Sequence, residues 1–335
     1  MYDITLTELL GESKAKKILW FPITSNPDEE YCSVLKHRLD MYVKKLEENK
    51  KRIFSDGQAI EPFFLNGNGS NSINNDQMVS YTKTLVNGIE QCHKAYCDGN
   101  VNEAYFNLFD AFNKINLGSL LETSGFIKKL ERNHVYYRIR KCKKTEEKED
   151  FYHISFKKTH LCKDDRYNIK GYPCLYLSHS REGSIAEMGY SKSEDSIASF
   201  NLKKESQRRL LDLTLDNKNL NKDTAKEMNQ KIVIHILWPL IAACKGISRY
   251  CKANECECSV QPKHFKIEYV IPQMLAEYVH FRLKLNGIIY FTVRKEDFDT
   301  AESNLKNYIL FTKASGGSKE YDMDLLNEFE INVEK

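Results

Sequence analysis

The sequence predicts an α+β protein, in which a mixed β-sheet with packed helices follows a mainly helical N-terminal region. Apolar residues recur at helical spacing in the first third of the chain, whereas from about Asn133 they occur in short runs separated by loops. A chain of 335 residues is also long enough for two domains. We therefore expect a helical region over 1–128, a sheet-containing domain over 129–315 and an acidic tail over 316–335.

Three helices are expected in the N-terminal region. The first follows the capping residue Asn26, contains Tyr, Val and Leu at helical spacing, and ends in a basic run at Arg52. Two more are expected over about Gln77 to Cys97 and about Val101 to Asn116. The segment 66–76 has almost no apolar side chains and is rich in Asn and Gly, which predicts a loop or linker.

Short strands are expected in the second region. Tyr136–Arg140 alternates aromatic, basic and aliphatic residues, which indicates a strand with both arginines on one face. Apolar or β-branched runs predict the other strands at Phe151–Phe156, Cys174–Ser178, Ile197–Phe200, Arg209–Leu213, Gly287–Val293 and Tyr308–Phe311.

A basic loop and several helices connect these strands. Residues 166–173 are basic and rich in turn formers, and Ser180–Gly189 forms a short helix that begins at a capping serine and ends at a glycine. Asn221–Cys244 predicts a long helix with a buried final half, and Met274–Leu285 an amphipathic helix. The acidic tail from Glu320 is expected to be a peripheral helix or frayed.

Composition excludes several classes of partner. A net charge of +3 predicts no whole-surface field, so an anionic ligand would need a local cluster of basic residues. Basic patches at 141–144, 157–158 and 203–204 lack interleaved aromatic residues, which argues against nucleic-acid binding. With neither a secretory signal nor an 18-residue apolar run, we expect a cytoplasmic protein with reduced cysteines and no membrane contact.

A cluster of cysteines raises the question of a metal. Cys244, Cys251, Cys256 and Cys258 are followed by His264. Cys256 and Cys258 are closer together than the pair of a standard zinc knuckle, and Cys244 falls on a predicted helix. Reduced loop cysteines are therefore favoured over a structural zinc, and we expect no metal.

Six short motifs follow one another in the second region: Tyr137-Arg138, Arg166-Tyr167-Asn168 with Gly171, Leu175–Ser178, Ala186-Glu187, Glu268-Tyr269 through Pro272-Gln273, and Gly287–Tyr290. No single motif is specific. Their order and spacing resemble the RES-domain family over roughly Asn133 to Thr312. The resemblance implies a fold like that of mono-ADP-ribosyltransferase toxins, NAD as substrate, and often a role as the toxin of a bacterial toxin–antitoxin pair.

The resemblance also implies roles for named residues. Glu187, Arg138 and Thr292 would be catalytic, with Thr292 in the position of the family's serine. Arg138, Arg166, Tyr176 and Asn168 would bind NAD, because guanidinium groups suit a pyrophosphate and a tyrosine can stack on an aromatic ring. Each residue also has an ordinary structural explanation: ion pairing or solvation for the arginines, core packing for Tyr176 and Thr292, and simple exposure for Glu187.

The reaction itself leaves alternatives open. Cleavage of the nicotinamide–ribose bond creates a cation-like sugar, which a carboxylate such as Glu187 can stabilise. Position 185, where arginine-modifying transferases commonly carry a second acid, is Ile185, which favours water or phosphate as acceptor. The first expectation is an NAD glycohydrolase or phosphorylase that acts as a toxin or defence effector. The alternatives are a mono-ADP-ribosyltransferase acting on a protein and a non-catalytic NAD-binding or interaction module. A separately encoded antitoxin or inhibitor is a possible partner.

Overall fold

The computed structural model describes residues 23–25, 29–53, 63–64, 70–71, 73–140, 145–188, 195–214, 225–248, 265–292, 305–314 and 320–334. These residues confirm the α+β class. The chain forms two compact units, each made of two segments: Met1–Phe126 with Leu215–Met274, and Ile127–Thr214 with Leu275–Lys335. This division differs from the single domain expected over 129–315, because the segment 215–274 packs with the N-terminal helices.

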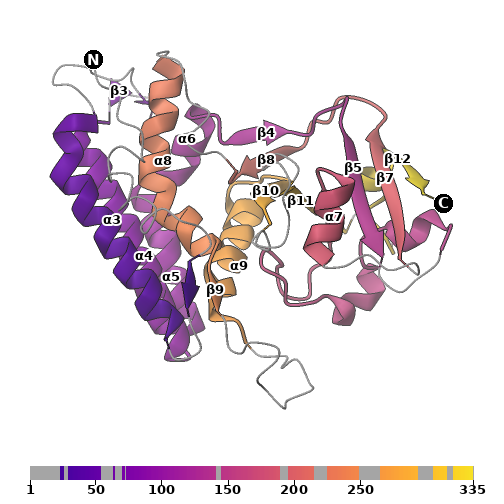
Figure 1. The fold of residues 1–335 in the computed structure, drawn as a ribbon, viewed down its shortest axis with the longest axis horizontal. Helices are drawn as coiled ribbons and strands as arrows, with labels where there is room; N and C mark the ends of the chain where they lie inside the picture. The colour runs from indigo at the N-terminus through magenta and orange to yellow at the C-terminus, as the bar shows by residue number, and fades with distance from the viewer. Residues whose placement is uncertain are drawn as a thin grey trace. The chain divides into compact units, whose positions relative to one another are not determined.

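The first unit is mainly helical. Neighbouring helices α3, α4 and α5 pack along one another (Figure 1), and α4 begins with a capping box in which Asn74 and Gln77 exchange hydrogen bonds. The helices and short strands of this unit are α3 (Tyr31–Ile53), α4 (Asn75–Cys97), α5 (Val101–Lys114), α6 (Leu117–Thr123), α8 (Ala225–Cys244), β1 (Thr24–Ser25), β2 (Phe63–Phe64), β3 (Ser70–Asn71), β9 (Ile247–Ser248) and the short 3₁₀ helix η4 (Ile267–Tyr269).

Helix α8 explains why the segment 215–274 belongs to this unit. Its final half is apolar on every side and buried, so it needs helices around it. Trp238 of α8 stacks on Tyr42 of α3 with 4.2 Å between ring centroids, and the Tyr42 hydroxyl donates to the main-chain oxygen of His235 at 2.9 Å. These contacts between distant segments complete the helical core.

Two buried histidines should make the protein sensitive to acid. Burial lowers the pKa of His93 and of His235 to about 4, whereas an unfolded histidine titrates near 6.5. As the pH falls, the unfolded state therefore takes up protons first. We expect the free energy of unfolding to fall by about 2 kcal/mol per histidine between pH 7 and pH 5.

Urea unfolding at the two pH values measures this effect. A His93→Phe variant should lose part of the pH dependence, whereas replacing the exposed His37 of α3 with glutamine should change it little. An identical pH dependence in the His93→Phe variant and the parent protein would show that His93 is not responsible.

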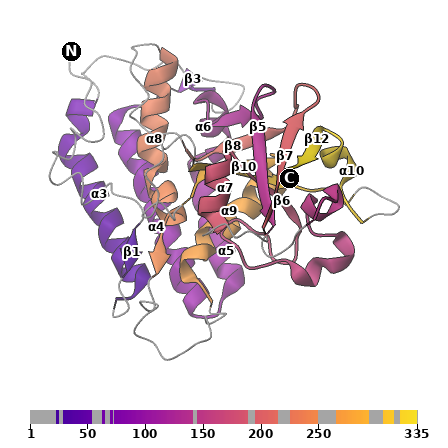
Figure 2. The same cartoon turned by 45° about the vertical axis from the view of Figure 1, so that its right-hand side comes forward.

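The second unit is built on an eight-stranded mixed sheet in the order β12-β7-β5-β6-β11-β10-β8-β4. Neighbours are antiparallel except β10 and β8, which are parallel. At one end of the sheet β12 runs along β7 (Figure 2). The strands are β4 (Ile127–Lys129), β5 (Val135–Arg140), β6 (Cys174–Ser178), β7 (Ser196–Leu202), β8 (Arg209–Asp212), β10 (Gly287–Phe291), β11 (Lys306–Phe311) and β12 (Phe329–Val333).

Short helices accompany the sheet. They are η1 (Lys148–Phe151), η2 (Phe156–Leu161), α7 (Arg181–Met188), the π-helical turn η5 (Tyr278–Arg282) and α10 (Met323–Leu326). The boundary between the units at Met274 falls inside α9 (Val270–Glu277), which η5 continues. The helix expected over Met274–Leu285 therefore begins four residues earlier than predicted.

The prediction of a strand over Phe151–Phe156 is wrong. Arg140 donates from Nε to the main-chain oxygen of Asp150 at 2.6 Å and from Nη2 to that of Tyr152 at 2.8 Å. In a strand, these main-chain oxygens would accept hydrogen bonds from a neighbouring strand, but here the Arg140 guanidinium occupies them. The backbone forms 3₁₀ turns at both ends of the segment.

The acidic tail is also more ordered than expected. Asp322 caps α10 by accepting from the Leu325 main-chain N–H at 3.0 Å, and its other carboxylate oxygen accepts from the Lys313 N–H at 2.7 Å. Phe329 and Ile331 then alternate with exposed residues along β12, an edge strand of the sheet. The tail is an integral part of the second unit.

Several expectations fall outside the described residues. They include the cap at Asn26, the helix end at Gly189, and the cysteines and histidine between Cys251 and His264. Of the loop expected over 66–76, the described part contains β3 and the beginning of α4.

Candidate functional site

A row of polar side chains crosses one face of the sheet in the second unit. The register pairs Tyr137 of β5 with Ser178 of β6, Ser178 with Asn307 of β11, and Asn307 with Tyr290 of β10. Directly paired residues project from the same face of a sheet, so these four side chains form one line, called here the polar row. The opposite face of these strands carries the apolar core of the unit.

Helix α7 brings a carboxylate to the polar row. The helix begins where the Ser180 hydroxyl accepts from the Gly183 N–H at 2.9 Å, which confirms the expected cap, and it packs against β5 and β6. Near its end, Glu187 accepts a hydrogen bond of 2.9 Å from Nδ2 of Asn307. The polar row and α7 together therefore hold Glu187.

Two tyrosines lie within electrostatic reach of this carboxylate. Burial, followed by the negative charge of Glu187, raises the pKa of Tyr290 well above its ordinary value. Burial also raises the pKa of Tyr176, with smaller contributions from Cys174, Tyr290 and other groups that include Glu187. Both hydroxyls stay neutral at physiological pH, and the Tyr290 ring packs against Tyr167 with 4.7 Å between ring centroids.

The basic loop before β6 completes this region. Asn168 donates to the Lys163 main-chain oxygen at 2.6 Å and accepts from the Tyr176 hydroxyl at 3.1 Å. Arg166 is buried, and the ring of the next residue, Tyr167, lies 4.7 Å from the ring of Tyr290, so this loop lies beside β10. Four expected site residues thus gather in one region: Glu187, Tyr176, Asn168 and Arg166.

Arg138 is placed differently. It pairs with Ala198 of β7 and alternates with Tyr137, so its side chain leaves the sheet on the face of the apolar core. Its side chain is buried, and Nη1 donates to the main-chain oxygen of Tyr176 at 3.5 Å. Burial and then the charge of Arg140 lower its pKa. The structure therefore connects Arg138 to the strand that carries Tyr176.

Thr292 follows the end of β10. It is buried, and its main-chain N–H donates to the Leu305 oxygen at 3.0 Å. Side chains alternate between the two faces along β10, so Thr292 projects from the same face as Tyr290, two residues before it. Thr292 therefore lies on the side of the sheet that carries the polar row.

The polar row contains residues that sequence reasoning missed as site candidates. Asn307 directly precedes the expected strand Tyr308–Phe311, and Ser178 and Tyr290 belong to motifs of the resemblance but have no role assigned by it. The sequence does contain one usable signal. Side chains alternate along a strand, so Asn307 faces the same side as the buried Ile309, two positions after it. The partners across the strands, however, depend on register.

The region can perform limited chemistry by itself. A carboxylate beside aromatic rings can stabilise a developing positive charge, and a neighbouring guanidinium can bind an anion. Among the described residues no group of His, Cys, Asp or Glu is arranged to hold a metal ion. None of the described helices combines the length and apolar character needed to cross a membrane.

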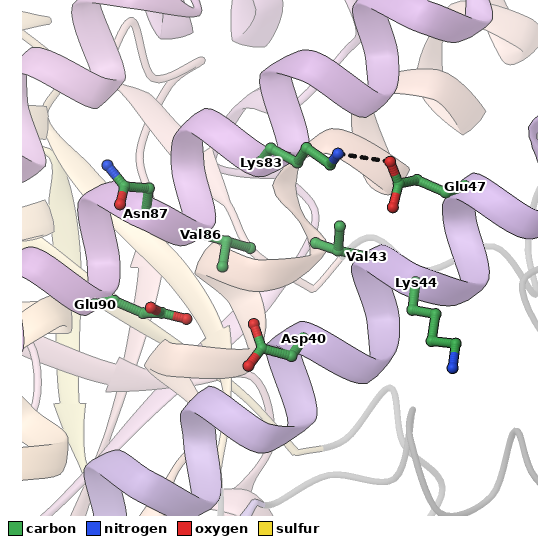
Figure 3. Close-up of a pocket in the computed structure, with 8 residues that line it drawn as sticks. All are labelled: Asp40, Val43, Lys44, Glu47, Lys83, Val86, Asn87 and Glu90. Carbon is green, nitrogen blue, oxygen red and sulfur yellow. Dashed lines mark ion pairs between the residues drawn. The ribbon is translucent and has the colours of Figure 1, made fainter.

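A shallow groove of about 290 Å³ lies elsewhere, between α3 and α4 of the first unit (Figure 3). Both signs of charge line it: Lys83 lies 2.5 Å from Glu47, and the carboxylates of Asp40 and Glu90 pair with Lys36, which is not a lining residue. Exposed pairs of this kind contribute little to stability and leave the groove without a dominant charge. It is not part of the region around Glu187.

Comparison with known proteins gives two matches. The model of the RES domain matches residues 135–325, which is more than half of the chain. A protein of Bacillus subtilis (strain 168), named Putative toxin YopC, is 28% identical over 215 residues, 60% of this chain and 46% of that protein. The chain thus spans about half the length of this curated relative. No solved structure matches the chain.

Proposed function

Because this chain belongs to the RES-domain family, we propose that it is an enzyme that cleaves the bond between nicotinamide and ribose in NAD, with water or phosphate as acceptor. The observation that carries the proposal is the Glu187 carboxylate, which Asn307 holds beside Tyr290 and Tyr176. The name of the Bacillus subtilis relative supports a role as a toxin. A toxic activity of this kind would require a separately encoded inhibitor.

The chemistry assigns a task to each residue of the region. The C–N bond breaks with both electrons on the nicotinamide, which leaves as a neutral molecule, and the ribose becomes oxocarbenium-like. Glu187 stabilises that positive charge, and the acceptor then forms the new bond to the same carbon and loses a proton. Arg166 binds the pyrophosphate, and Tyr176 and Tyr290 pack against the nicotinamide or ribose.

Three expected residues receive supporting tasks. Arg138 acts on the main chain of Tyr176 rather than on the substrate, so we assign it to the positioning of β6. Thr292 supports the floor of the region. Asn168 fixes the Tyr176 ring through the hydroxyl hydrogen bond.

The direct test is incubation of the purified chain with NAD while free nicotinamide is measured. Release accompanied by ADP-ribose identifies water as the acceptor, and release accompanied by the ribose-phosphorylated product identifies phosphate. Transfer of label from the adenylate half of NAD to a macromolecule would replace this proposal by protein ADP-ribosylation. Ile185, in place of a second acid, argues against an arginine acceptor.

Replacing Arg166 with lysine should weaken NAD binding. Lysine keeps the charge but loses the two-pronged hydrogen bonding of guanidinium, so we expect KM for NAD to rise about tenfold with little change in kcat. Steady-state kinetics measure both constants. Lys170→Ala removes an exposed cation from the same loop and is the matched control. Equal KM values for the Arg166→Lys variant and the parent would remove Arg166 from the binding site.

A further inference from the structure

Two buried residues of the polar row form a chain of hydrogen bonds that ends on Glu187. The Ser178 hydroxyl donates to Oδ1 of Asn307 at 2.8 Å, and Nδ2 of Asn307 donates to Oε2 of Glu187 at 2.9 Å. Ser178 is 6% exposed and Asn307 3% exposed. We propose that Ser178 and Asn307 are positioning residues that orient the Glu187 carboxylate for NAD cleavage, an inference that rests on the proposed function.

The chemistry of the three groups allows one arrangement of the amide. An ionised carboxylate only accepts hydrogen bonds, so the NH₂ group of Asn307 must face Glu187. The amide oxygen then faces Ser178, whose hydroxyl supplies the donor. The orientation of each group therefore agrees with that of the next, and the half-buried carboxylate receives a hydrogen-bond donor.

The fold makes Asn307 a firm support. Its strand β11 lies inside the sheet, between β6 and β10, and forms ladders with both. Glu187, by contrast, is next to the last residue of a helix of eight residues. A donor fixed in the middle of a sheet can hold a carboxylate at a helix end to within the small displacement that catalysis tolerates.

The decisive variant is Asn307→Asp, which keeps the shape of the side chain, removes the donor and places a second negative charge beside Glu187. The charged form of Glu187 then becomes harder to maintain. We expect the acid limb of the pH dependence of kcat to move up by about one pH unit, and kcat at pH 7 to fall about 10- to 100-fold, while KM for NAD changes little. Asn332→Asp on the exposed side of β12 introduces the same charge in the same sheet and is the matched control.

Ser178 provides a second and milder test. Ser178→Ala removes the hydroxyl that orients Asn307 and should lower kcat about threefold to tenfold, whereas Ser178→Thr keeps the hydroxyl and should restore most of the activity. If the Asn307→Asp variant does not fold, as judged by circular dichroism, this pair of variants decides the proposal. An equal loss of kcat in Ser178→Ala and Ser178→Thr would overturn it.

Failure of the positioning proposal can be distinguished from failure of the proposed function. If the unchanged protein releases no nicotinamide, the proposed function fails; the pair is then tested by following the ¹³C resonance of the Glu187 carboxyl against pH. A titration midpoint that is higher in Asn307→Asp than in the parent supports the coupling. Unmoved midpoints, or unmoved pH–rate profiles in an active enzyme, refute it.

Discussion

Glu187→Gln should lower kcat for nicotinamide release by about 100- to 1,000-fold while the protein remains folded. Glutamine has the size of glutamate, and its amide oxygen can still accept the hydrogen bond from Asn307. The variant therefore keeps the contacts of the side chain and loses only the negative charge. Because the substrate itself carries no oxocarbenium character, KM for NAD should change much less than kcat.

Glu182→Gln is the control for this experiment. Glu182 is exposed and lies in the first turn of the same helix, α7. Its replacement by glutamine removes the same charge from the other end of the helix. Its activity should stay within about twofold of the parent. Comparable nicotinamide release from Glu187→Gln and the parent would take Glu187 out of the reaction, whatever the activity of the control.

Gly287→Ala should destabilise the second unit by about 3 kcal/mol. A Cβ atom at position 287 would lie 2.1 Å from the main-chain oxygen of Ile309 and 2.6 Å from Cδ2 of Leu210. The oxygen belongs to the neighbouring strand β11 and cannot move away without disturbing the β10–β11 ladder. Tyr290 lies on the same strand, so activity should fall with stability.

Urea unfolding followed by circular dichroism measures the loss. Gly171→Asn is the comparison: Gly171 has a φ of 71° with nothing within 4 Å of a Cβ, and asparagine tolerates that backbone conformation. Its free energy of unfolding should change by about 1 kcal/mol or less. Similar stabilities for Gly287→Ala and the parent would mean that β10 and β11 are not as close as the structure has them.

Local patterns in the sequence predicted many of the elements. The capped run after Ser180 forms α7, and the strands expected at Tyr136–Arg140 and Cys174–Ser178 are β5 and β6. Such elements depend on periodicity and capping within about ten residues, which a single sequence contains. Phe329 and Ile331 in the tail also alternate with polar residues, which is a local pattern typical of a strand. The acidic residues around them favoured the prediction of a peripheral or frayed tail instead.

The arrangement of the candidate site depended on information that no local pattern contains. Sequence reasoning grouped Arg138 with Glu187, but the register between β5, β6 and β7 puts Arg138 on the core face. The register between β6 and β11 places Asn307 opposite Ser178, where its amide reaches Glu187. Register between strands that are distant in the sequence is set by the packing of the whole unit, so it could not be predicted from the residues themselves.

The position of β11 in the middle of the sheet has a consequence for the order of events during synthesis. Strands β6 and β10 are made before β11, yet neither can complete its pairing until residues 306–311 are inserted between them. Asn307 arrives with that insertion. Glu187 therefore lacks this support until β11 has been made and inserted, although the helix that carries the carboxylate is synthesised much earlier.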